Sequence, residues 1–182
     1  KLPYMTGKLF KMGVDNSKII KMKKFNKNKK TIIIFPHCFY DHPHRFRSMI
    51  FNDFYEQAKY FLDKSKILTS YNWVYKPHPN ELEGNDNFHL DLAKRYPNVI
   101  FLNKDTSHYN LLKLNVKLAI TNHGTLAHEY SYLNIPVINT GDNPHINYDF
   151  CLNVKNKKEL DCVMSNLDIS LRKIKFSKSK IY

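Results

Sequence analysis

The stretch VKLAITNHGTLAHEYSYLNIPVIN, residues 116–139, decides the fold of this chain. VKLAIT (residues 116–121) and IPVIN (residues 135–139) are short, mainly apolar runs with several β-branched side chains, which favour strands. Between them, GTLAHEYSYLN (residues 124–134) is typical of a helix. A strand, a helix and a strand in close succession predict two parallel strands of one sheet.

The same alternation of strands and helices extends over most of the chain. TIIIF (residues 31–35) is a continuous run of apolar, mainly β-branched residues, which is typical of a strand buried on both faces of a parallel sheet. The other predicted strands are NWVYK (72–76) and NVIFL (98–102), and the other predicted helices are SMIFNDFYEQAKYFLDKSKIL (48–68), FHLDLAKRY (88–96), TSHYNLLKLN (106–115) and NKKELDCVMSNL (156–167). We therefore predict the α/β fold class, with a Rossmann-like, mainly parallel sheet of five or six strands flanked by helices.

The chain divides into three parts by composition. Residues 1–30 are basic and weakly periodic, and we interpret them as a linker or the remnant of a preceding domain. Residues 31–170 form the predicted Rossmann-like domain, and residues 171–182 form a basic tail. The first residues lack both an initial methionine and the apolar core of a signal peptide, so we expect the chain to be part of a longer protein. No run approaches 18 apolar residues, so we expect no transmembrane helix.

The net charge is strongly positive and favours an anionic partner. The 182 residues carry 29 Lys and Arg against 16 Asp and Glu, a formal net charge of +13 at pH 7. Much of the surplus lies in KMKKFNKNKK (21–30) and LRKIKFSKSKIY (171–182), which are either solvated ends or contacts to an anionic membrane surface. No zinc finger, basic zipper or RNA-binding aromatic motif is present, so we expect no nucleic acid partner.

The three cysteines, Cys38, Cys151 and Cys162, are an odd number without close spacing. This pattern favours free thiols in a reducing compartment, so we expect a cytoplasmic protein. We interpret Cys151 and Cys162 as ordinary small hydrophobic residues.

Polar loops follow four of the predicted strands. They are PHCFYDHPHR (36–45), KPHPNE (76–81), TNHGT (121–125) and TGDNPH (140–145). Ligands of parallel α/β sheets bind beyond the carboxyl ends of the strands, so these loops are expected to line one ligand-binding edge.

The segment KPHP presents a lysine and a histidine from a rigid elbow. Pro77 and Pro79 keep Lys76 and His78 out of the helical region, so both side chains are held in a fixed direction. A cation and an imidazole displayed together suit an anion such as a phosphate. Because a protonated imidazole binds an anion better, we expect affinity to fall as pH rises through about 6–7.5. The alternative is a turn histidine beside an exposed lysine.

The segment NHGT forms a second candidate anion site at the start of a helix. Asn122 and His123 turn the chain, Gly124 gives backbone freedom and Thr125 begins the helix, whose exposed amides attract anions. Glu129 lies in the first turns of this helix, where a carboxylate suits a sugar hydroxyl. Taken alone, these residues are also explained by a helix cap, a loop histidine and a solvated glutamate.

The His-rich loop after the first strand is a third basic group. His37, His42 and His44 lie beside Cys38, but their spacing lacks the framework of known metal sites, so we predict no metal. Candidates for contact with a donor or an acceptor are His37, Asp41, His42, Arg45, Asp142 and Asn143. His89 and His108 fall on predicted helices away from the strand ends, and we assign them no role.

Several of these segments together resemble one known family. KPHPNE, PNVIFL and LAITNHGTLAHEYSYLNIPVINTGD, with IIIFPHCFYDHPHRF before them, are similar to the C-terminal half of bacterial capsule-polysaccharide glycosyltransferases. These enzymes have two Rossmann domains (the GT-B type) and include Kdo transferases; polysialyltransferases, teichoic-acid glycerophosphotransferases and nucleotide-sugar 2-epimerases are wider relatives. The resemblance covers about residues 30–155.

The resemblance implies a domain that binds a nucleotide-sugar donor, such as a CMP- or other NDP-sugar. It implies that Lys76 and His78 contact the donor phosphate, that the turn at residues 122–125 binds phosphate or nucleotide, and that Glu129 faces the ribose. It further implies a glycan or glycolipid acceptor, no metal or other cofactor, and a catalytic base on a missing N-terminal domain. The alternatives are half of a 2-epimerase or of a glycerophosphotransferase, or a non-enzymatic basic module on the inner face of the membrane.

Overall fold

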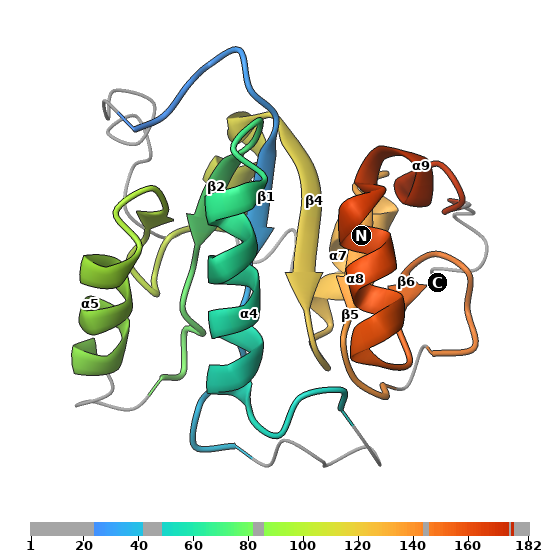
Figure 1. Ribbon diagram of the computed structural model, residues 1–182, viewed down its shortest axis with the longest axis horizontal. Coiled ribbons are helices and arrows are strands. Elements are labelled where there is room, and N and C mark those ends of the chain that lie inside the picture. Colours follow the sequence, from blue (N-terminus) through green and yellow to red (C-terminus); the bar gives the residue numbers. More distant parts are fainter. Residues whose placement is uncertain (1–23, 42–48, 82–85, 144–145, 175, 177–182) are drawn as a thin grey trace.

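The computed structural model describes residues 24–41, 49–81, 86–143, 146–174 and 176, and helix and strand labels follow Figure 1. The predicted segment before residue 24, most of the basic tail after residue 171, and the candidate contacts His42 and Arg45 lie outside the described residues.

The core of the fold is a six-stranded parallel sheet with the order β3-β2-β1-β4-β5-β6. The strands are β1 (Thr31–Ile34), β2 (Asn72–Tyr75), β3 (Ile100–Phe101), β4 (Val116–Thr121), β5 (Val137–Asn139) and β6 (Leu152–Asn153). The predicted α/β class and the parallel Rossmann-like sheet are confirmed. All five predicted strands are present, and the short β6 is the one that the sequence did not indicate.

The strand order places a crevice between β1 and β4. Outward from β1 the chain builds β2 and then β3, and it then returns to β1 to add β4, β5 and β6 on the other side. Connections that leave neighbouring strands in opposite directions open a gap at the carboxyl ends, where such sheets bind ligands. The arrows of β1 and β4 point to this edge at the bottom of Figure 1.

Helices cover both faces of the sheet. The helical elements are α4 (Phe54–Ile67), α5 (Asp86–Arg95), α6 (His108–Leu111), η1 (Leu112–Leu114), α7 (Leu126–Tyr132), α8 (Lys157–Ser165) and α9 (Leu167–Leu171). Apolar residues of α4, α5, α8 and α9 pack in one cluster, and those of α6, η1 and α7 pack in a second cluster on the other face. Figure 1 shows α4 and α8 in front of the sheet and α7 behind it.

The central strand β1 joins the two apolar clusters. Ile32 and Ile34 belong to the cluster beneath α4, whereas Ile33 belongs to the one beneath α7, and none is more than 1% exposed. Burial of each such side chain contributes about 1.5–3 kcal/mol. The continuous apolar run in the sequence therefore reflects burial on both faces, as predicted.

Helix α4 begins later than its apolar pattern suggested. The sequence predicted a helix from residue 48, but α4 starts at Phe54 because Asp53 is its N-cap and accepts the backbone N–H of Glu56 at 2.7 Å. The Glu56 carboxylate in turn accepts the backbone N–H of Asn52, the residue before the N-cap, at 2.8 Å, which also ties the chain to the start of the helix. No helix among the described residues has both the length and the apolar character needed to cross a bilayer.

Candidate functional site

A cavity of about 690 Å³, here called the main cavity, opens where the loops after β1, β2, β3 and β4 meet. Its wall includes Phe35, Pro36, His37, Lys76, Pro77, His78, Pro79, Asn80, Lys104, Asp105, Thr106, His108, Thr121, Gly124, Thr125, Leu126 and Glu129. Its volume is within the range of pockets that hold small ligands and cofactors. The structure therefore brings the KPHP elbow and the NHGT turn, which are far apart in sequence, to one cavity.

Lys76 is a buried cation in the wall of this cavity. Its residue is 2% exposed, and its Nζ donates to the carbonyl oxygens of Lys104 at 2.8 Å and Pro77 at 3.3 Å. Burial lowers the pKa of Lys76 to about 8, although the nearby carboxylate of Asp105 raises it in part. Two neutral carbonyls do not compensate a buried charge, so an anion in the cavity would stabilise this lysine.

His78 is a neutral hydrogen-bond donor rather than a cation. Burial, with smaller contributions from His37 and Lys76, lowers the pKa of His78 to about 4. Its Nδ1 accepts the backbone N–H of Asn80 at 3.2 Å and lies 2.9 Å from the Sγ of Cys38. Because Nδ1 accepts, Nε2 carries the proton and remains a donor. His78 can therefore bind an anion as a neutral donor through Nε2, and the expectation that it binds in the protonated form stays a prediction.

The side chain of His37 stands next to His78 in the wall. The two rings stack with centroids 5.5 Å apart, and the other face of His37 stacks on Phe54 at 4.8 Å. The Asp41 carboxylate lies 3.5 Å from Nδ1 of His37. Desolvation outweighs this carboxylate and lowers the pKa of His37. Both predicted contacts, His37 and Asp41, thus lie at the site, with His37 in the wall.

The NHGT turn divides into residues that line the main cavity and residues that support it. Gly124, Thr125 and Glu129 lie in the wall, and burial raises the pKa of Glu129. Asn122 is 0% exposed and accepts the Thr140 hydroxyl at 3.2 Å, and His123 contacts the carbonyl oxygen of Asp142 at 2.7 Å. The sequence predicts that both residues bind phosphate or nucleotide, but neither is part of the main cavity wall.

Helix α7, which follows the turn, has only seven residues, Leu126–Tyr132. A short helix gives little dipole, so we do not assign anion binding to its N-terminus. The cation and the imidazole of the elbow are the stronger candidates.

A chain of hydrogen bonds supports the NHGT turn from behind. Gln57 of α4 donates to the Thr140 hydroxyl at 2.6 Å, Thr140 donates to Asn122, and Asn122 donates to the sulfur of Met49 at 3.3 Å. A Cβ on Gly141 would lie 2.3 Å from Oδ1 of Asn122, so only glycine fits there without a shift. The turn is thereby tied to both α4 and the end of β5.

Sequence reasoning missed residues that follow the third strand. Lys104 and Asp105 lie in the wall, as does His108, which stacks on Phe35 at 5.4 Å and lies 3.1 Å from the Tyr130 hydroxyl through Nδ1. The expected position of His108 away from the strand ends is wrong. Burial, with a smaller contribution from Lys76, lowers its pKa to about 3. The rule used for the other strand ends would have found Lys104 and Asp105.

His89 also lies closer to the site than its helical position suggested. It is 7% exposed, and its Nδ1 lies 3.1 Å from the hydroxyl of Tyr75, the last residue of β2. Its Nε2 lies 3.5 Å from the carboxylate of Glu81, which ends the KPHPNE elbow. The prediction that His89 lies away from the strand ends is therefore wrong.

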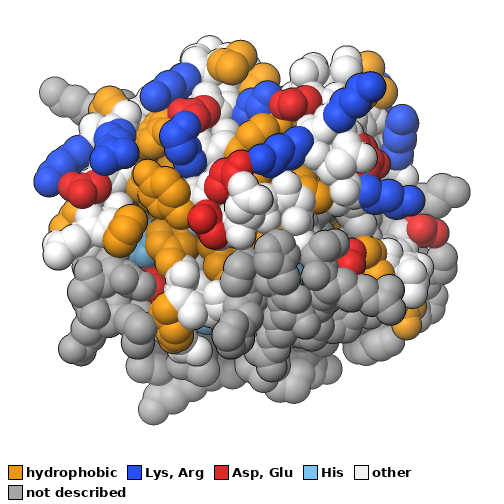
Figure 2. All heavy atoms as spheres, turned by 60° about the horizontal axis from the view of Figure 1, so that its bottom comes forward, with side chains coloured by type: hydrophobic (Ala, Val, Ile, Leu, Met, Phe, Trp, Pro, Cys, Tyr) orange, Lys and Arg blue, Asp and Glu red, His pale blue; other side chains and the backbone are white. Residues whose placement is uncertain are grey.

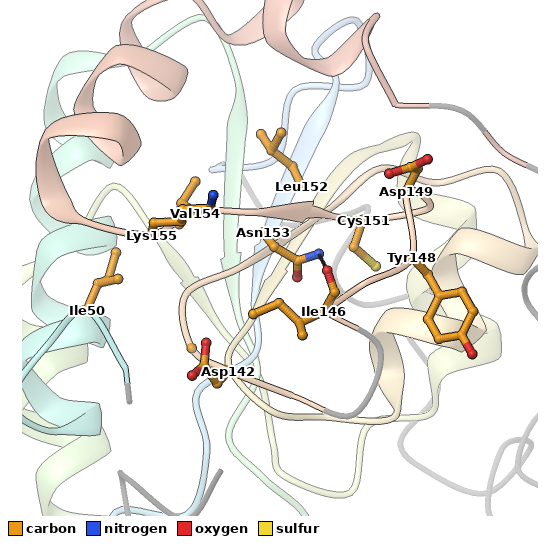
Figure 3. A pocket seen from close by; sticks show the side chains of 11 residues that line it. Ile50, Asp142, Ile146, Tyr148, Asp149, Cys151, Leu152, Asn153, Val154 and Lys155 are labelled. Atoms are coloured by element: carbon orange, nitrogen blue, oxygen red, sulfur yellow. Dashed lines mark hydrogen bonds between the residues drawn. The ribbon is translucent and has the colours of Figure 1, made fainter. Parts of the chain in front are cut away.

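Asp142 and Asn143 follow β5, and Asp142 lies in the wall of a second cavity of about 420 Å³. Asp142 lines this second cavity together with Ile146 and Asn153, as Figure 3 shows. Asn143 is 5% exposed and donates to the carbonyl oxygen of Gly141 at 2.9 Å. The predicted contacts after β5 are thus separate from the elbow.

Within the ranges that the structure describes, no group of three or more His, Cys, Asp or Glu side chains is arranged to hold a metal ion. The three cysteines are free, with Cys38 and Cys151 buried. Cys162 is exposed, whereas a cysteine that serves as a small hydrophobic residue is usually buried, as Cys151 is.

Lysines on the described surface are interspersed with acidic residues. In Figure 2, Lys and Arg side chains lie among Asp and Glu side chains on the face that is presented. Lys64 pairs with Asp161 at 2.7 Å, and Lys157 pairs with Glu56. Most of the surplus positive charge belongs to residues outside the described ranges.

Comparison with solved structures identifies related folds. The chain is similar to a UDP-GlcNAc 2-epimerase of Methanocaldococcus jannaschii, solved in complex with UDP-GlcNAc and UDP, with 17% identity and a TM-score of 0.54. The match covers 93% of this chain and 46% of the epimerase chain. The wall teichoic acid polymerase TagF is also similar, with 15% identity, a TM-score of 0.47 and coverage of 91% and 40%.

No protein-family model and no curated protein sequence matches the chain. The chain spans less than half the length of the structures it resembles. At these identities the similarity shows the fold alone. This fold is the α/β arrangement with a parallel, Rossmann-like sheet described above.

Proposed function

We propose that the main cavity binds the nucleotide part of a nucleotide-sugar, and that the chain is the donor-binding half of a glycosyltransferase for a capsule or surface polysaccharide. Lys76 and His78 would bind the donor phosphate, the backbone around Gly124 and Thr125 would approach the nucleotide, and Glu129 would face the ribose. The acceptor would be a glycan or glycolipid.

The single observation that carries the proposal is Lys76. A lysine that is 2% exposed, has a pKa of about 8 and donates to two neutral carbonyl oxygens is costly for the fold. A bound phosphate compensates this cost, because an opposite charge within a few ångströms restores the charged form. The position of the lysine at a ligand-sized cavity supports binding rather than packing.

His78 supplies an oriented hydrogen-bond donor beside the charge of Lys76. Its Nδ1 is held as an acceptor by the backbone of Asn80, so Nε2–H is a donor at every pH well above 4. A hydrogen bond to an ionised acceptor is stronger than a neutral one. Lys76 and His78 together would hold the phosphate by one charge and one oriented donor.

The same pair suits the chemistry of glycosyl transfer. When the bond between the sugar carbon and the phosphate oxygen breaks, negative charge accumulates on that oxygen. A fixed cation and a fixed donor stabilise developing charge without reorganisation at the moment of reaction. The proposal places the catalytic base outside this chain, on an N-terminal domain, and places the basic ends of the chain near anionic lipid at the cytoplasmic face.

Two other assignments use the same cavity differently. A 2-epimerase half would surround the sugar ring with carboxylates, and a glycerophosphotransferase would take a CDP-glycerol-type donor. The wall of the main cavity holds Asp105 and Glu129 but has Lys76, Lys104 and His78 around the elbow. This basic character favours recognition of the phosphate, and product analysis of the longer protein separates the three reactions.

Isothermal titration calorimetry with CMP, CDP, UDP and GDP tests the proposal, with cytidine and uridine as controls without phosphate. We expect one nucleotide to bind at least tenfold more tightly than the others and its nucleoside to bind weakly. Equal weak binding of all four nucleotides, together with binding to anionic vesicles, would instead identify a basic surface module.

A further inference from the structure

A buried polar chain lies directly behind the wall of the main cavity. It consists of Tyr75 at the end of β2, His89 on α5 and Glu81 at the end of the elbow. The Tyr75 hydroxyl lies 3.1 Å from Nδ1 of His89, and Nε2 of His89 lies 3.5 Å from the Glu81 carboxylate. The side chain of Glu81 is 0% exposed and that of His89 is 8% exposed, so this polar chain is inside the protein.

The elbow itself is closed by hydrogen bonds that run through Glu81. The backbone N–H of Glu81 donates to the carbonyl oxygen of His78 at 3.2 Å. The Nζ of Lys104 donates to the carbonyl oxygen of Glu81 at 3.2 Å, and the Nζ of Lys76 donates to the carbonyl oxygen of Lys104 at 2.8 Å. A fixed position of Glu81 therefore restrains the backbone of His78 directly and the Nζ of Lys76 through Lys104.

None of the three residues of the polar chain belongs to the wall of the main cavity. They can influence a ligand only through the elbow. The ring of Phe39 packs against that of His89, with centroids 5.1 Å apart.

Stability does not explain the presence of this polar chain. Burying a carboxylate and an imidazole costs desolvation energy, and apolar replacements of buried ion pairs are often neutral or stabilising. The Tyr75–His89 hydrogen bond is directional, however, because it fixes an angle as well as a distance, and it holds the His89 ring 3.5 Å from the Glu81 carboxylate. Its placement at the one strand end that carries Lys76 and His78 is the informative observation.

We infer that Tyr75, His89 and Glu81 are positioning residues that hold the KPHPNE elbow in the orientation in which Lys76 and His78 meet a phosphate. This inference rests on the proposed phosphate site and deepens it. It predicts that a change behind the wall weakens phosphate binding without touching the ligand.

Tyr75→Phe is the cleanest test because it removes a single buried hydroxyl. Tyr96→Phe is its matched control: Tyr96 is 4% exposed, follows the same helix α5, and donates to Asp63 at 2.8 Å, away from the main cavity. Glu81→Gln is a second variant that keeps the shape of the side chain and removes its charge.

Two measurements apply to each variant. ³¹P NMR titration with inorganic phosphate measures binding at the phosphate site, and it does not depend on which nucleobase the protein prefers. Hydrogen exchange of the Asn80 and Glu81 amides, which bond to Nδ1 and the carbonyl oxygen of His78, reports the order of the elbow. The Phe35 amide, which bonds to Ile120 in the sheet, is the internal control.

We expect Tyr75→Phe to weaken phosphate binding about tenfold and to speed exchange at Asn80 and Glu81 only. Tyr96→Phe should leave the phosphate affinity and the exchange of these amides unchanged, although it should lower the melting temperature about as much as Tyr75→Phe does. If the wild type binds phosphate and Tyr75→Phe and Glu81→Gln bind it equally well, the positioning role is overturned while the proposed function stands. If the wild type binds neither phosphate nor nucleotide, both are overturned.

Discussion

The backbone N–H of Asn80 donates a hydrogen bond to Nδ1 of His78 at 3.2 Å. An amide N–H can only donate, so this contact fixes His78 as the tautomer with its proton on Nε2. With a pKa of about 4, His78 has one protonation state across the physiological range. Lys76, with a pKa of about 8, is the group at the elbow that titrates close to the physiological pH range.

The affinity for a nucleoside diphosphate is therefore expected to depend on pH through Lys76. A lysine is charged below its pKa, so affinity should change little between about pH 7 and 8 and then fall toward tenfold per pH unit above about 8. Calorimetry over pH 7–9.5, where the phosphates stay ionised, measures this slope. Lys76→Ala should bind the nucleotide weakly, with an affinity that does not change over this pH range. A steep fall in the affinity of the wild type between pH 6 and 7.5 would instead show that protonated His78 binds the phosphate.

Lys76→Met should make the protein more stable at pH 7, although it removes binding. Burial lowers the pKa of Lys76 from 10.5 to about 8, so the unfolded state binds more protons than the folded state. At pH 7 this difference lowers the free energy of unfolding of the wild type by about 3 kcal/mol. Because this cost fades as pH rises from 8 toward 10.5, the advantage of the variant should shrink by about 2 kcal/mol between pH 7 and 9.5.

Urea denaturation of wild type and Lys76→Met at both pH values checks this difference. Subtracting the two proteins removes the titration of other groups, such as Cys38, whose pKa burial raises to about 11. A variant that is less stable than the wild type at pH 7 would show that Lys76 serves packing instead of binding.

A comparison of Gly141→Ala with Gly124→Ala tests how the NHGT turn is held in place. A Cβ at Gly141 would lie 2.3 Å from Oδ1 of Asn122 and 2.9 Å from the His123 ring, and this contact requires movement of the turn. At Gly124 the nearest atom, Oγ1 of Thr121, is 3.1 Å away and can give way. We expect Gly141→Ala to cost about 1–3 kcal/mol of unfolding free energy and Gly124→Ala clearly less. Equal costs in urea denaturation would contradict this description of the turn.

The sequence predicts the sheet well because its central strands are buried on both faces. The isoleucines of β1 are buried on both faces of the sheet, and residues 118–120 of β4 are 0% exposed, so an apolar run of strand length was sufficient to identify both strands. The two-residue strand β6, Leu152–Asn153, pairs with β5 at the edge of the sheet and is too short for any pattern. Its existence depends on tertiary contacts.

The candidate site was predictable only in part, because the sequence places a residue on a loop but does not orient its side chain. Lys76 and His78 follow a strand and are fixed by two prolines, and both lie in the wall as expected. Asn122 follows a strand as well, yet it turns inward to Thr140. His89 and His108 reach the site from helices, and helical spacing does not show what lies beneath a helix.

The central claim is that His78 donates a hydrogen bond to the phosphate of a nucleotide, and one comparison tests it most directly. The affinity of the preferred nucleotide and of its nucleoside is measured by calorimetry for wild type and His78→Ala. His128→Ala is the control, because this half-buried histidine packs at a tilt against Phe150 and is not part of the main cavity wall. The claim predicts a loss of about ten- to hundredfold for the nucleotide, almost none for the nucleoside, and a melting temperature close to that of the control. Equal losses for nucleotide and nucleoside, or a collapse of the melting temperature in His78→Ala alone, would contradict it.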